Sequence, residues 1–422
     1  MPRSFRFVHA ADLHIDSRFV AWSGAPEVVR QTLLESTHRA FRNLIDLCIR
    51  REAAFLVVAG DVFDSSDRGV RAQLRFRDGL AELAGRGIPS FVVHGNHDPL
   101  DGWINSISFP PEVKVFGPAP EWAIAMSGGA PVAQIQGVSY ATQETRSNLA
   151  GRFTEPNEAG LFSIGLLHGN LGGNPDHANY APCTTSDLEA PGIDYWALGH
   201  IHRRQVIREF APAIVYPGNT QGRDIGEPGP RGCYVVDVDE SRYAKPEFAP
   251  LDVVRWARTD IRVDDANSLD DVIGAIERHL RELKAGCEGR SLVCRAVLTG
   301  NGPIHAELAR GDAVGQLLSH IRDAFVPDEP WVWLDSLEDL TLPDLDIDRR
   351  ASESDFLGLL LSRANSAIAD GAQMAEIEQK LNAALRTNRD RDWADALTAA
   401  EVTALLDRVR WLVAERLEWQ DR

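Results

Sequence analysis

The sequence predicts an α/β protein whose N-terminal part is a sandwich of two sheets. Three observations predict this fold class. Apolar strand patterns alternate with helical patterns in residues 5–93, strand patterns follow one another with little helix in residues 113–167, and several apolar runs end in side chains that can bind metals. Alternating strand–helix units are typical of a sheet that is at least partly parallel. The uninterrupted strands predict a second sheet packed against the first.

The first strands and helices follow in a regular order. An apolar run at Phe5–Val8 precedes a helical stripe over Pro26–Glu52, and a run at Phe55–Val58 precedes an amphipathic helix over Val70–Ala84. A short buried strand then ends at Val92–Val93. We expect the first helix to cover the sheet as the chain returns to the next strand, and the second helix to lead to the central strand.

The next stretch predicts mainly strands. Strand patterns occupy Val113–Phe116, Val132–Tyr140 and Phe162–Leu167. Residues Asn170–Asp187 are polar and rich in Gly and Pro, which predicts a long loop beside the site. A closing strand is predicted over Gly232–Val238. The first domain is therefore expected to span residues 1–250.

The rest of the chain predicts two further parts, since 422 residues are enough for two or three domains. Residues 251–345 predict a small α+β cap domain, with strand and helix patterns at Val253–Val263, Ser268–Lys284, Ser291–Thr299, His305–Phe325 and Pro330–Asp335. Residues 346–422 predict a helical segment. Its apolar stripe is compatible with packing inside its own domain and with docking on the coiled coil of a partner.

Composition excludes some classes of protein. No run reaches the ~18 apolar residues of a membrane-spanning helix, and no signal peptide is recognisable, so we expect a cytoplasmic protein that contacts no membrane. The net charge is −18, which is unfavourable for a protein that binds nucleic acid by itself. The five scattered cysteines form neither a zinc pattern nor a redox pair.

Five strand ends carry the candidate site. Side chains that can bind a metal follow each of five apolar runs, and strand ends of open α/β sheets meet in one crevice. These side chains are Asp12 and His14, Asp61, Asn96 with His97 and Asp98, His168, and His200 with His202. Each motif alone is more often a surface turn, but five in order predict one site with two metal ions.

The residue types match phosphoester hydrolysis. Two divalent cations about 3.5–4 Å apart can generate a hydroxide and neutralise phosphate oxygens. Asp61 is the natural bridging carboxylate, and Asn96 and His168 complete two sets of four ligands with Asp12, His14, His200 and His202. Carboxylate, amide and imidazole favour Mn²⁺, Fe or Zn²⁺ over Ca²⁺. His97 would protonate the leaving oxygen or hold the phosphate, and Asp98 would orient it.

The motifs resemble those of the calcineurin-like metallophosphoesterases. The resemblance extends to SbcD-type DNA repair exonucleases of the YhaO-like branch through Gly60–Asp64, His97–Leu100, Gly102-Trp103, Leu198–His202 and Tyr216–Arg223. It implies a four-layer α-β-β-α sandwich and Mn²⁺-dependent exo- and endonuclease activity on DNA. It also implies a partner, an SMC-like coiled-coil ATPase bound through the C-terminal helices, and dimerisation in some members.

The resemblance also implies a ligand assignment. One ion would be held by Asp12, His14, Asp61 and His202, and the other by Asp61, Asn96, His168 and His200. His97 would be catalytic. Some nucleases of this kind have a histidine where Asp64 stands.

Three hypotheses follow for the function. The first is a metal-dependent nuclease that acts on DNA ends in repair. The second is a phosphatase or phosphodiesterase for small-molecule or protein substrates, which the acidic charge favours. The third is an inactive scaffold whose C-terminal helices bind an ATPase.

Overall fold

The computed structural model describes residues 4–17, 19, 22, 24–64, 69–102, 107–172, 180–327, 329–387 and 397–420. By its internal contacts the chain divides into two compact units. The first consists of Met1–Arg258, Leu283–Arg295 and Phe325–Asp335, and the second of Thr259–Glu282, Ala296–Ala324 and Ser336–Arg422. The division into three domains at residues 250 and 345 stays a prediction.

The first unit contains a sheet with the strand order β12-β11-β1-β2-β3-β4. These strands are β1 (Phe5–Ala10), β2 (Phe55–Ala59), β3 (Ser90–Val93), β4 (Val113–Val115), β11 (Gly232–Val238) and β12 (Ala244–Pro250). Strands β1 to β4 are parallel, and β11 runs antiparallel to β1. All five residues of β2 are buried, as expected for a central strand covered on both faces.

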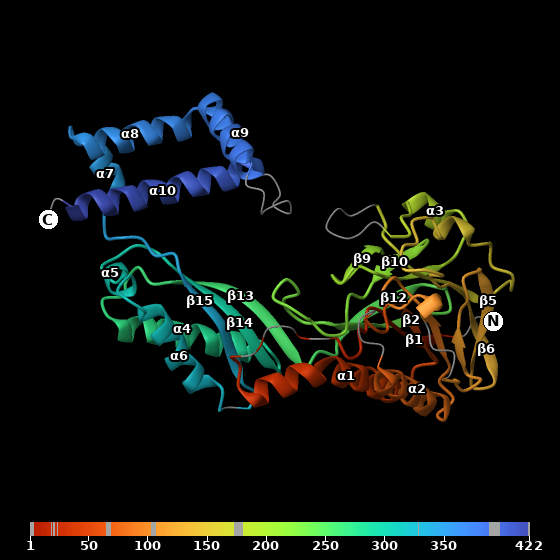
Figure 1. The fold of residues 1–422 in the computed structure, drawn as a ribbon. Helices are drawn as coiled ribbons and strands as arrows, with labels where there is room; N and C mark the ends of the chain where they lie inside the picture. Colours follow the sequence, from red (N-terminus) through yellow and green to blue (C-terminus); the bar gives the residue numbers. More distant parts are fainter. Residues whose placement is uncertain are drawn as a thin grey trace. The chain divides into compact units, whose positions relative to one another are not determined.

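Helices α1 (Glu27–Arg50) and α2 (Val70–Ala84) lie along the outer face of this sheet (Figure 1). Both helices are found where the sequence predicts them. Phe41 of α1 and Phe76 of α2 are packed with Val58 of β2 in one buried apolar cluster. The apolar stripe of each helix thus accounts for its position on the sheet.

A second sheet has the strand order β5-β6-β7-β8-β10-β9. Its strands are β5 (Glu121–Ser127), β6 (Ala130–Val138), β7 (Phe162–His168), β8 (Tyr195–Gly199), β9 (Gln205–Arg208) and β10 (Ala213–Tyr216). Strands β6, β7, β8 and β10 are parallel. Among the described residues, the short helices η2 (Ala150–Arg152) and α3 (Thr185–Glu189) pack on the outer face of this sheet.

Aromatic rings fill the space between the two sheets. Phe7 of β1 stacks on Phe55 of β2 with ring centroids 5.1 Å apart, and it meets Tyr195 of β8 edge to face at 5.2 Å. All three rings are fully buried. The predicted sandwich of two sheets with helices on its outer faces is confirmed.

Three strands were not predicted from the sequence. They are β5, β9 and β12, which lie at the edges of their sheets. Edge strands are partly exposed, and in β5 a single residue, Ala125, is buried. The sequences of β9 and β12 lack the apolar run that marks the central strands. Strand β5 does contain an apolar run, at residues 122–126, which sequence reasoning missed. The predicted loop over Asn170–Asp187 includes the start of α3, and its residues 173–179, like Trp103, lie outside the described part of the chain.

Strands β13 (Val254–Arg262), β14 (Ser291–Thr299) and β15 (Val332–Asp339) form a three-stranded sheet in that order. Helix α4 (Leu269–Ala285) agrees with the prediction. The predicted helix over His305–Phe325 is two helices, α5 (His305–Leu308) and α6 (Ala313–Phe325). The break contains Gly311 at a φ of +57°, a conformation that a right-handed helix cannot contain.

The C-terminal segment is helical, as predicted. It contains α7 (Ile347–Ala351), α8 (Phe356–Ala369), α9 (Gly371–Thr387) and α10 (Ala399–Gln420). A small apolar core includes Leu357 and Leu361 of α8 and Ala414 of α10. Within the described residues, no helix has both the length and the apolar character that crossing a membrane requires.

A close contact inside the second sheet gives a testable prediction. A side chain at Gly165 of β7 would meet the ring of Trp196 of β8, since a Cβ atom there would lie 2.6 Å from ring carbons. Gly165→Ala should therefore lower the free energy of unfolding by about 1–3 kcal/mol. Gly117→Ala is the matched control, because a Cβ there meets no atom within 4 Å. Thermal unfolding followed by circular dichroism measures both, and equal melting temperatures would contradict the packing described.

Candidate metal centre

The carboxyl ends of five strands bring the predicted site residues together. Asp12, Asp61 and Asn96 lie just beyond β1, β2 and β3 of the first sheet. His168 ends β7, and His200 follows β8 in the second sheet. Because neighbouring strands within each set are parallel, their carboxyl ends meet at the same edge of the sandwich.

The backbone is strained where it delivers these side chains. Asp12, His14, Asp61 and His200 all have positive φ, at 51°, 43°, 49° and 98°. Non-glycine residues rarely adopt this region, and such strain clusters at functional sites. Hydrogen bonds between the loops hold the conformation, including Asp12 N–H to Gly60 O at 3.0 Å. The strain indicates that the direction of these side chains matters more than local stability.

Glycines leave room among the polar side chains. A Cβ atom at Gly95 would lie 2.2 Å from Oδ1 of Asp61 and 2.8 Å from Nε2 of His168. A Cβ at Gly60 would lie 2.5 Å from Nδ1 of His168. A side chain at Gly95 would enter the space beside the ligand atoms, and a side chain at Gly60 would displace the ring of His168. The two glycines therefore form part of the cradle around the site.

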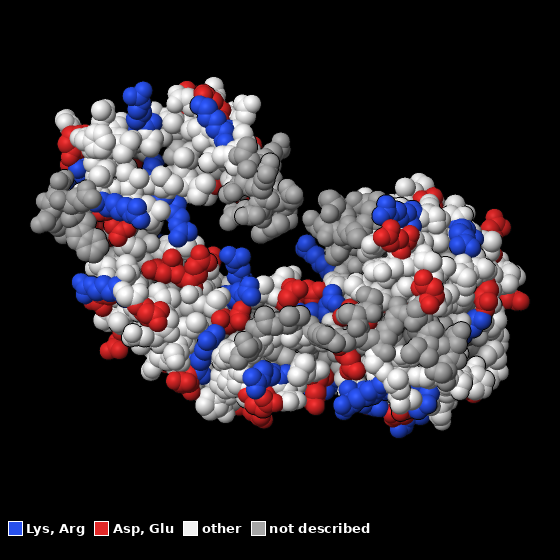
Figure 2. Space-filling view, viewed as in Figure 1, with Lys and Arg blue, Asp and Glu red and all other residues white. Residues whose placement is uncertain are grey.

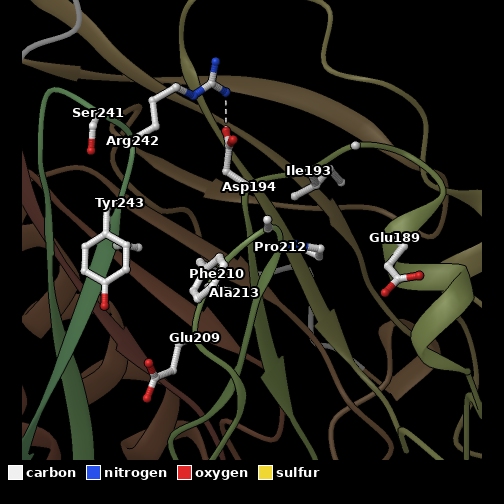
Figure 3. A pocket seen from close by; sticks show the side chains of 13 residues that line it. Glu189, Ile193, Asp194, Glu209, Phe210, Pro212, Ala213, Ser241, Arg242 and Tyr243 are labelled. Atoms are coloured by element: carbon white, nitrogen blue, oxygen red, sulfur yellow. Dashed lines mark hydrogen bonds and ion pairs between the residues drawn. The ribbon is translucent and has the colours of Figure 1, made fainter.

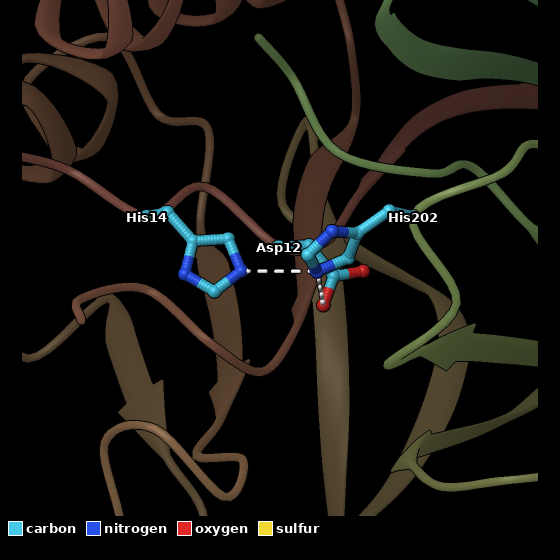
Figure 4. Close-up of side chains that lie close together, drawn as sticks. All are labelled: Asp12, His14 and His202. Carbon is cyan, nitrogen blue, oxygen red and sulfur yellow. Dashed lines mark hydrogen bonds and ion pairs between the residues drawn. The ribbon is translucent and has the colours of Figure 1, made fainter. Parts of the chain in front are cut away.

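A first cluster contains Asp12, His14 and His202 (Figure 4). The Nε2 atoms of His14 and His202 are 3.2 Å apart, and Nε2 of His202 is 4.0 Å from Oδ1 of Asp12. Asp61 approaches from the other side, with Oδ2 4.0 Å from Nε2 of His14. When each ring carries its proton on Nδ1, both Nε2 atoms and the nearby carboxylate oxygens present lone pairs to one another and cannot form hydrogen bonds. A cation between these atoms would remove their repulsion.

A second cluster contains Asp61, Asn96, His168 and His200. Nε2 of His168 lies 3.4 Å from Oδ2 of Asp61 and 3.1 Å from Oδ1 of Asn96. Nδ1 of His200 lies 3.2 Å from the same amide oxygen. Nδ1 of His168 is 2.9 Å from the carbonyl oxygen of Ala59, which positions its other nitrogen toward the cluster. Asp61 thus takes part in both clusters.

Asp61 is a buried charged group at the centre of the site, with 1% of its surface exposed. Burial raises the pKa of Asp61, but the nearby His168 and His14 outweigh burial and hold the pKa well below its usual range. Burial likewise lowers the pKa of His168, but the Asp61 charge outweighs it and raises the pKa to about 9. The buried carboxylate therefore demands positive charge beside it, which a cation could supply.

His97 and Asp98 lie next to the clusters but have different surroundings. The side chain of His97 is 37% exposed, and its backbone N–H donates to Oδ1 of Asp61 at 2.9 Å. The two oxygens of Asp98 accept from the backbone N–H groups of Val62 at 2.9 Å and Gly95 at 2.8 Å. Asp98 thus ties two of the loops together, while its expected role in orienting His97 stays a prediction.

Other carboxylates surround the first cluster. Oδ1 of Asp64 lies 2.6 Å from Nδ1 of His14 and 3.5 Å from Nδ1 of His97. Glu227 lies 2.6 Å from Nδ1 of His202, and Arg223 contacts Asp64 at 3.1 Å. Sequence reasoning missed Glu227, because it follows no strand and belongs to no motif. Its local signal is a single acidic residue between Gly226 and Pro228.

The donor set fits a pair of divalent cations. The two clusters offer carboxylate, amide and imidazole donors in a largely buried space, and Asp61 lies beside the histidines of both. Such donors suit divalent cations such as Mn²⁺, Fe²⁺ and Zn²⁺. Thiolate takes no part, since the five cysteines are buried elsewhere. The structure thus brings together all seven residues that the sequence nominates as ligands.

Comparisons with known proteins agree with this geometry. Residues 5–204 match the model of the calcineurin-like phosphoesterases, and residues 256–342 match that of the middle domain of metallophosphoesterase YhaO. An uncharacterised metallophosphoesterase of Bacillus subtilis, YhaO, is 36% identical over 342 residues, which cover 81% of this chain and 83% of the relative.

More distant relatives carry the name DNA double-strand break repair protein Mre11. The protein of Thermoplasma acidophilum is 25% identical over 299 residues, or 66% of this chain and 72% of the relative. The protein of Aeropyrum pernix is 24% identical over 291 residues, which cover 66% of this chain and 68% of the relative. Both the sequence match and the residues of the site lead to the same conclusion: the chain belongs to the calcineurin-like metallophosphoesterase family.

Proposed function

We propose that the protein is a metal-dependent nuclease that hydrolyses phosphodiester bonds at DNA ends in DNA repair, with exo- and endonuclease activity. The observation that carries the proposal is the pair of clusters joined by Asp61, beside His97, whose side chain is 37% exposed. The similarity to relatives named as DNA double-strand break repair proteins supports DNA as the substrate. Family membership supports the hydrolytic chemistry.

The metal ligands of the proposal are the seven residues of the two clusters. Asp12, His14, Asp61 and His202 would hold one cation, and Asp61, Asn96, His168 and His200 the other. We propose Mn²⁺, with Fe or Zn²⁺ as alternatives that suit the same donors. When bound, such a pair supplies Lewis-acid polarisation of the phosphoester and lowers the pKa of water.

The remaining chemistry belongs to the side chains. The backbone N–H of His97 donates to Asp61, and the His97 side chain is 37% exposed, so a substrate oxygen could reach its ring. It would donate a proton to the leaving oxygen. Asp64, 3.5 Å from Nδ1 of His97, is available to orient that ring.

A second candidate is a phosphatase or phosphodiesterase for small-molecule or protein substrates. The net charge of −18 favours it, because a DNA backbone is attracted by Lys and Arg. Figure 2 shows Lys and Arg mixed with Asp and Glu on the face in view. A partner that supplies basic surface would remove this objection to the nuclease.

We also propose that the C-terminal helices bind a coiled-coil helix of an SMC-like ATPase. Leu405, Val409 and Leu412 of α10 are exposed and recur at helical spacing, and Phe356 and Leu359 of α8 are exposed as well. A cavity of about 220 Å³ between these helices is lined almost entirely by apolar side chains, among them Leu360, Ile368, Leu406 and Val413. Apolar helix faces of this kind are typical docking sites for an amphipathic helix.

The nuclease proposal predicts metal-dependent cleavage of DNA. Incubated with Mn²⁺ and end-labelled duplex DNA, the purified protein should shorten the labelled strand, and EDTA should abolish the cleavage. It should also cleave bis-p-nitrophenyl phosphate faster than p-nitrophenyl phosphate. A preference for the monoester, without DNA cleavage even in the presence of the ATPase partner, would favour the phosphatase and reject the nuclease.

The assignment of roles predicts a difference between two variants. His97→Ala should retain two metal ions per chain and lose about 10²–10⁴-fold in turnover, because it removes a proton donor and no ligand. Asp61→Ala should lose metal as well as activity, because it removes the shared carboxylate. Metal content by mass spectrometry and turnover of bis-p-nitrophenyl phosphate measure the two effects. Equal metal loss in both variants would show that His97 is a ligand.

The helix-docking proposal predicts that charge on α10 blocks the partner. Leu405→Glu with Leu412→Glu should abolish the complex with a co-expressed SMC-like ATPase, measured by size-exclusion chromatography with light scattering. Thr403→Glu is the matched control, since Thr403 is an exposed polar residue of the same helix. If the variant instead dissociates a homodimer of the chain alone, the face joins two copies, and the ATPase proposal is wrong.

A further inference from the structure

Both histidines of the first cluster have a carboxylate against the ring nitrogen that faces away from the cluster. Asp64 lies 2.6 Å from Nδ1 of His14, and Glu227 lies 2.6 Å from Nδ1 of His202. A carboxylate can only accept a hydrogen bond, so each ring carries its proton on Nδ1. The lone pairs on the two Nε2 atoms, 3.2 Å apart, then point to the same place.

An arginine joins the two carboxylates. Nη1 of Arg223 lies 3.1 and 3.3 Å from the two oxygens of Asp64. Its Nη2 lies 4.0 Å from Glu227 and 3.5 Å from Nδ1 of His202. All three side chains are largely buried, at 23% exposure for Arg223 and 13% for each acid. Burial makes this geometry harder to rearrange than a surface ion pair.

Glu227 is held in place by further donors. Its Oε2 accepts from Nδ2 of Asn219 and from the backbone N–H of Arg223, both at 2.7 Å. The loop that carries Arg223 and Glu227 is anchored, since Nε1 of Trp256 donates a hydrogen bond to the carbonyl oxygen of Gly222 at 2.7 Å. These contacts fix the Glu227 carboxylate in the position from which it accepts the hydrogen bond of His202.

We propose that Asp64, Arg223 and Glu227 are positioning residues that fix the ring orientation and tautomer of His14 and His202, and so set the affinity of one of the two cation sites. The inference rests on the metal centre of the proposed function and deepens it. In the other site, the orientation of His168 is fixed by a backbone group instead of a carboxylate, because its Nδ1 faces the carbonyl oxygen of Ala59. Loss of the three positioning residues should therefore affect the two sites unequally.

Titration of metal-free protein with Mn²⁺, followed by calorimetry, tests this inference. Wild type should bind two Mn²⁺ ions per chain. Glu227→Gln keeps the shape of the side chain but cannot offer acceptors to His202 and to both of its other donors at once. It should weaken one site about 10–100-fold and leave the other unchanged. Asp64→Asn should weaken the same site, and Arg223→Ala should do so by a smaller factor.

Asp194→Asn is the matched control. Asp194 is a half-buried carboxylate that pairs with Arg242 (Figure 3) and accepts a hydrogen bond from Ser163. It precedes β8, whereas His200 follows the other end of that strand. This variant should bind both ions as wild type does. Melting temperatures of the metal-free variants show whether each is folded.

Three results would contradict the inference. Wild-type affinity at both sites in folded Glu227→Gln and Asp64→Asn would overturn it, and so would an equal loss at both sites, which would indicate general disruption. Wild type that binds no Mn²⁺ would reject the proposed metal centre itself, together with the inference that depends on it.

Discussion

The candidate metal centre depends on the burial of one carboxylate, that of Asp61, among side chains from both sheets. It is 1% exposed, lies 3.4 Å from His168 and 4.0 Å from His14, and accepts the backbone N–H of His97. A buried carboxylate is costly unless charge and hydrogen bonds compensate it. The histidines compensate part of the charge, and the donor set around it suits cations. This requirement accounts for the strained loops and for the glycines that leave the space open.

The two sheets make that burial possible. Parallel strands deliver Asp12, Asp61 and Asn96 from one sheet and His168 and His200 from the other. The aromatic core between the sheets, with Phe7, Phe55 and Tyr195, fixes their separation. A rigid scaffold is what a metal centre requires, because ligand atoms must keep their geometry to within a fraction of an ångström. The positive φ values at four site residues indicate that stability is given up locally for that geometry.

Around the clusters, a layer of hydrogen bonds determines which nitrogen of each ring faces inward. His168 uses the carbonyl of Ala59, whereas His14 and His202 use Asp64 and Glu227. The loop that carries Arg223 and Glu227 is anchored by Trp256, a residue of β13. The chain beyond residue 250 thus contributes directly to the surroundings of the site.

The sequence by itself determined the central strands, the covering helices and the residues nominated as ligands. Each of these leaves a local signal, because a buried strand must be apolar and a polar side chain at its end stands out. It did not determine the edge strands β5, β9 and β12. Strands β9 and β12 have no apolar run, and in the apolar run of β5 only Ala125 is buried. Only the tertiary structure brought Glu227 to His202 and Asp64 to His14. Those contacts join loops 25 and 50 residues apart, and a carboxylate in a loop looks the same in sequence whether it faces solvent or an imidazole.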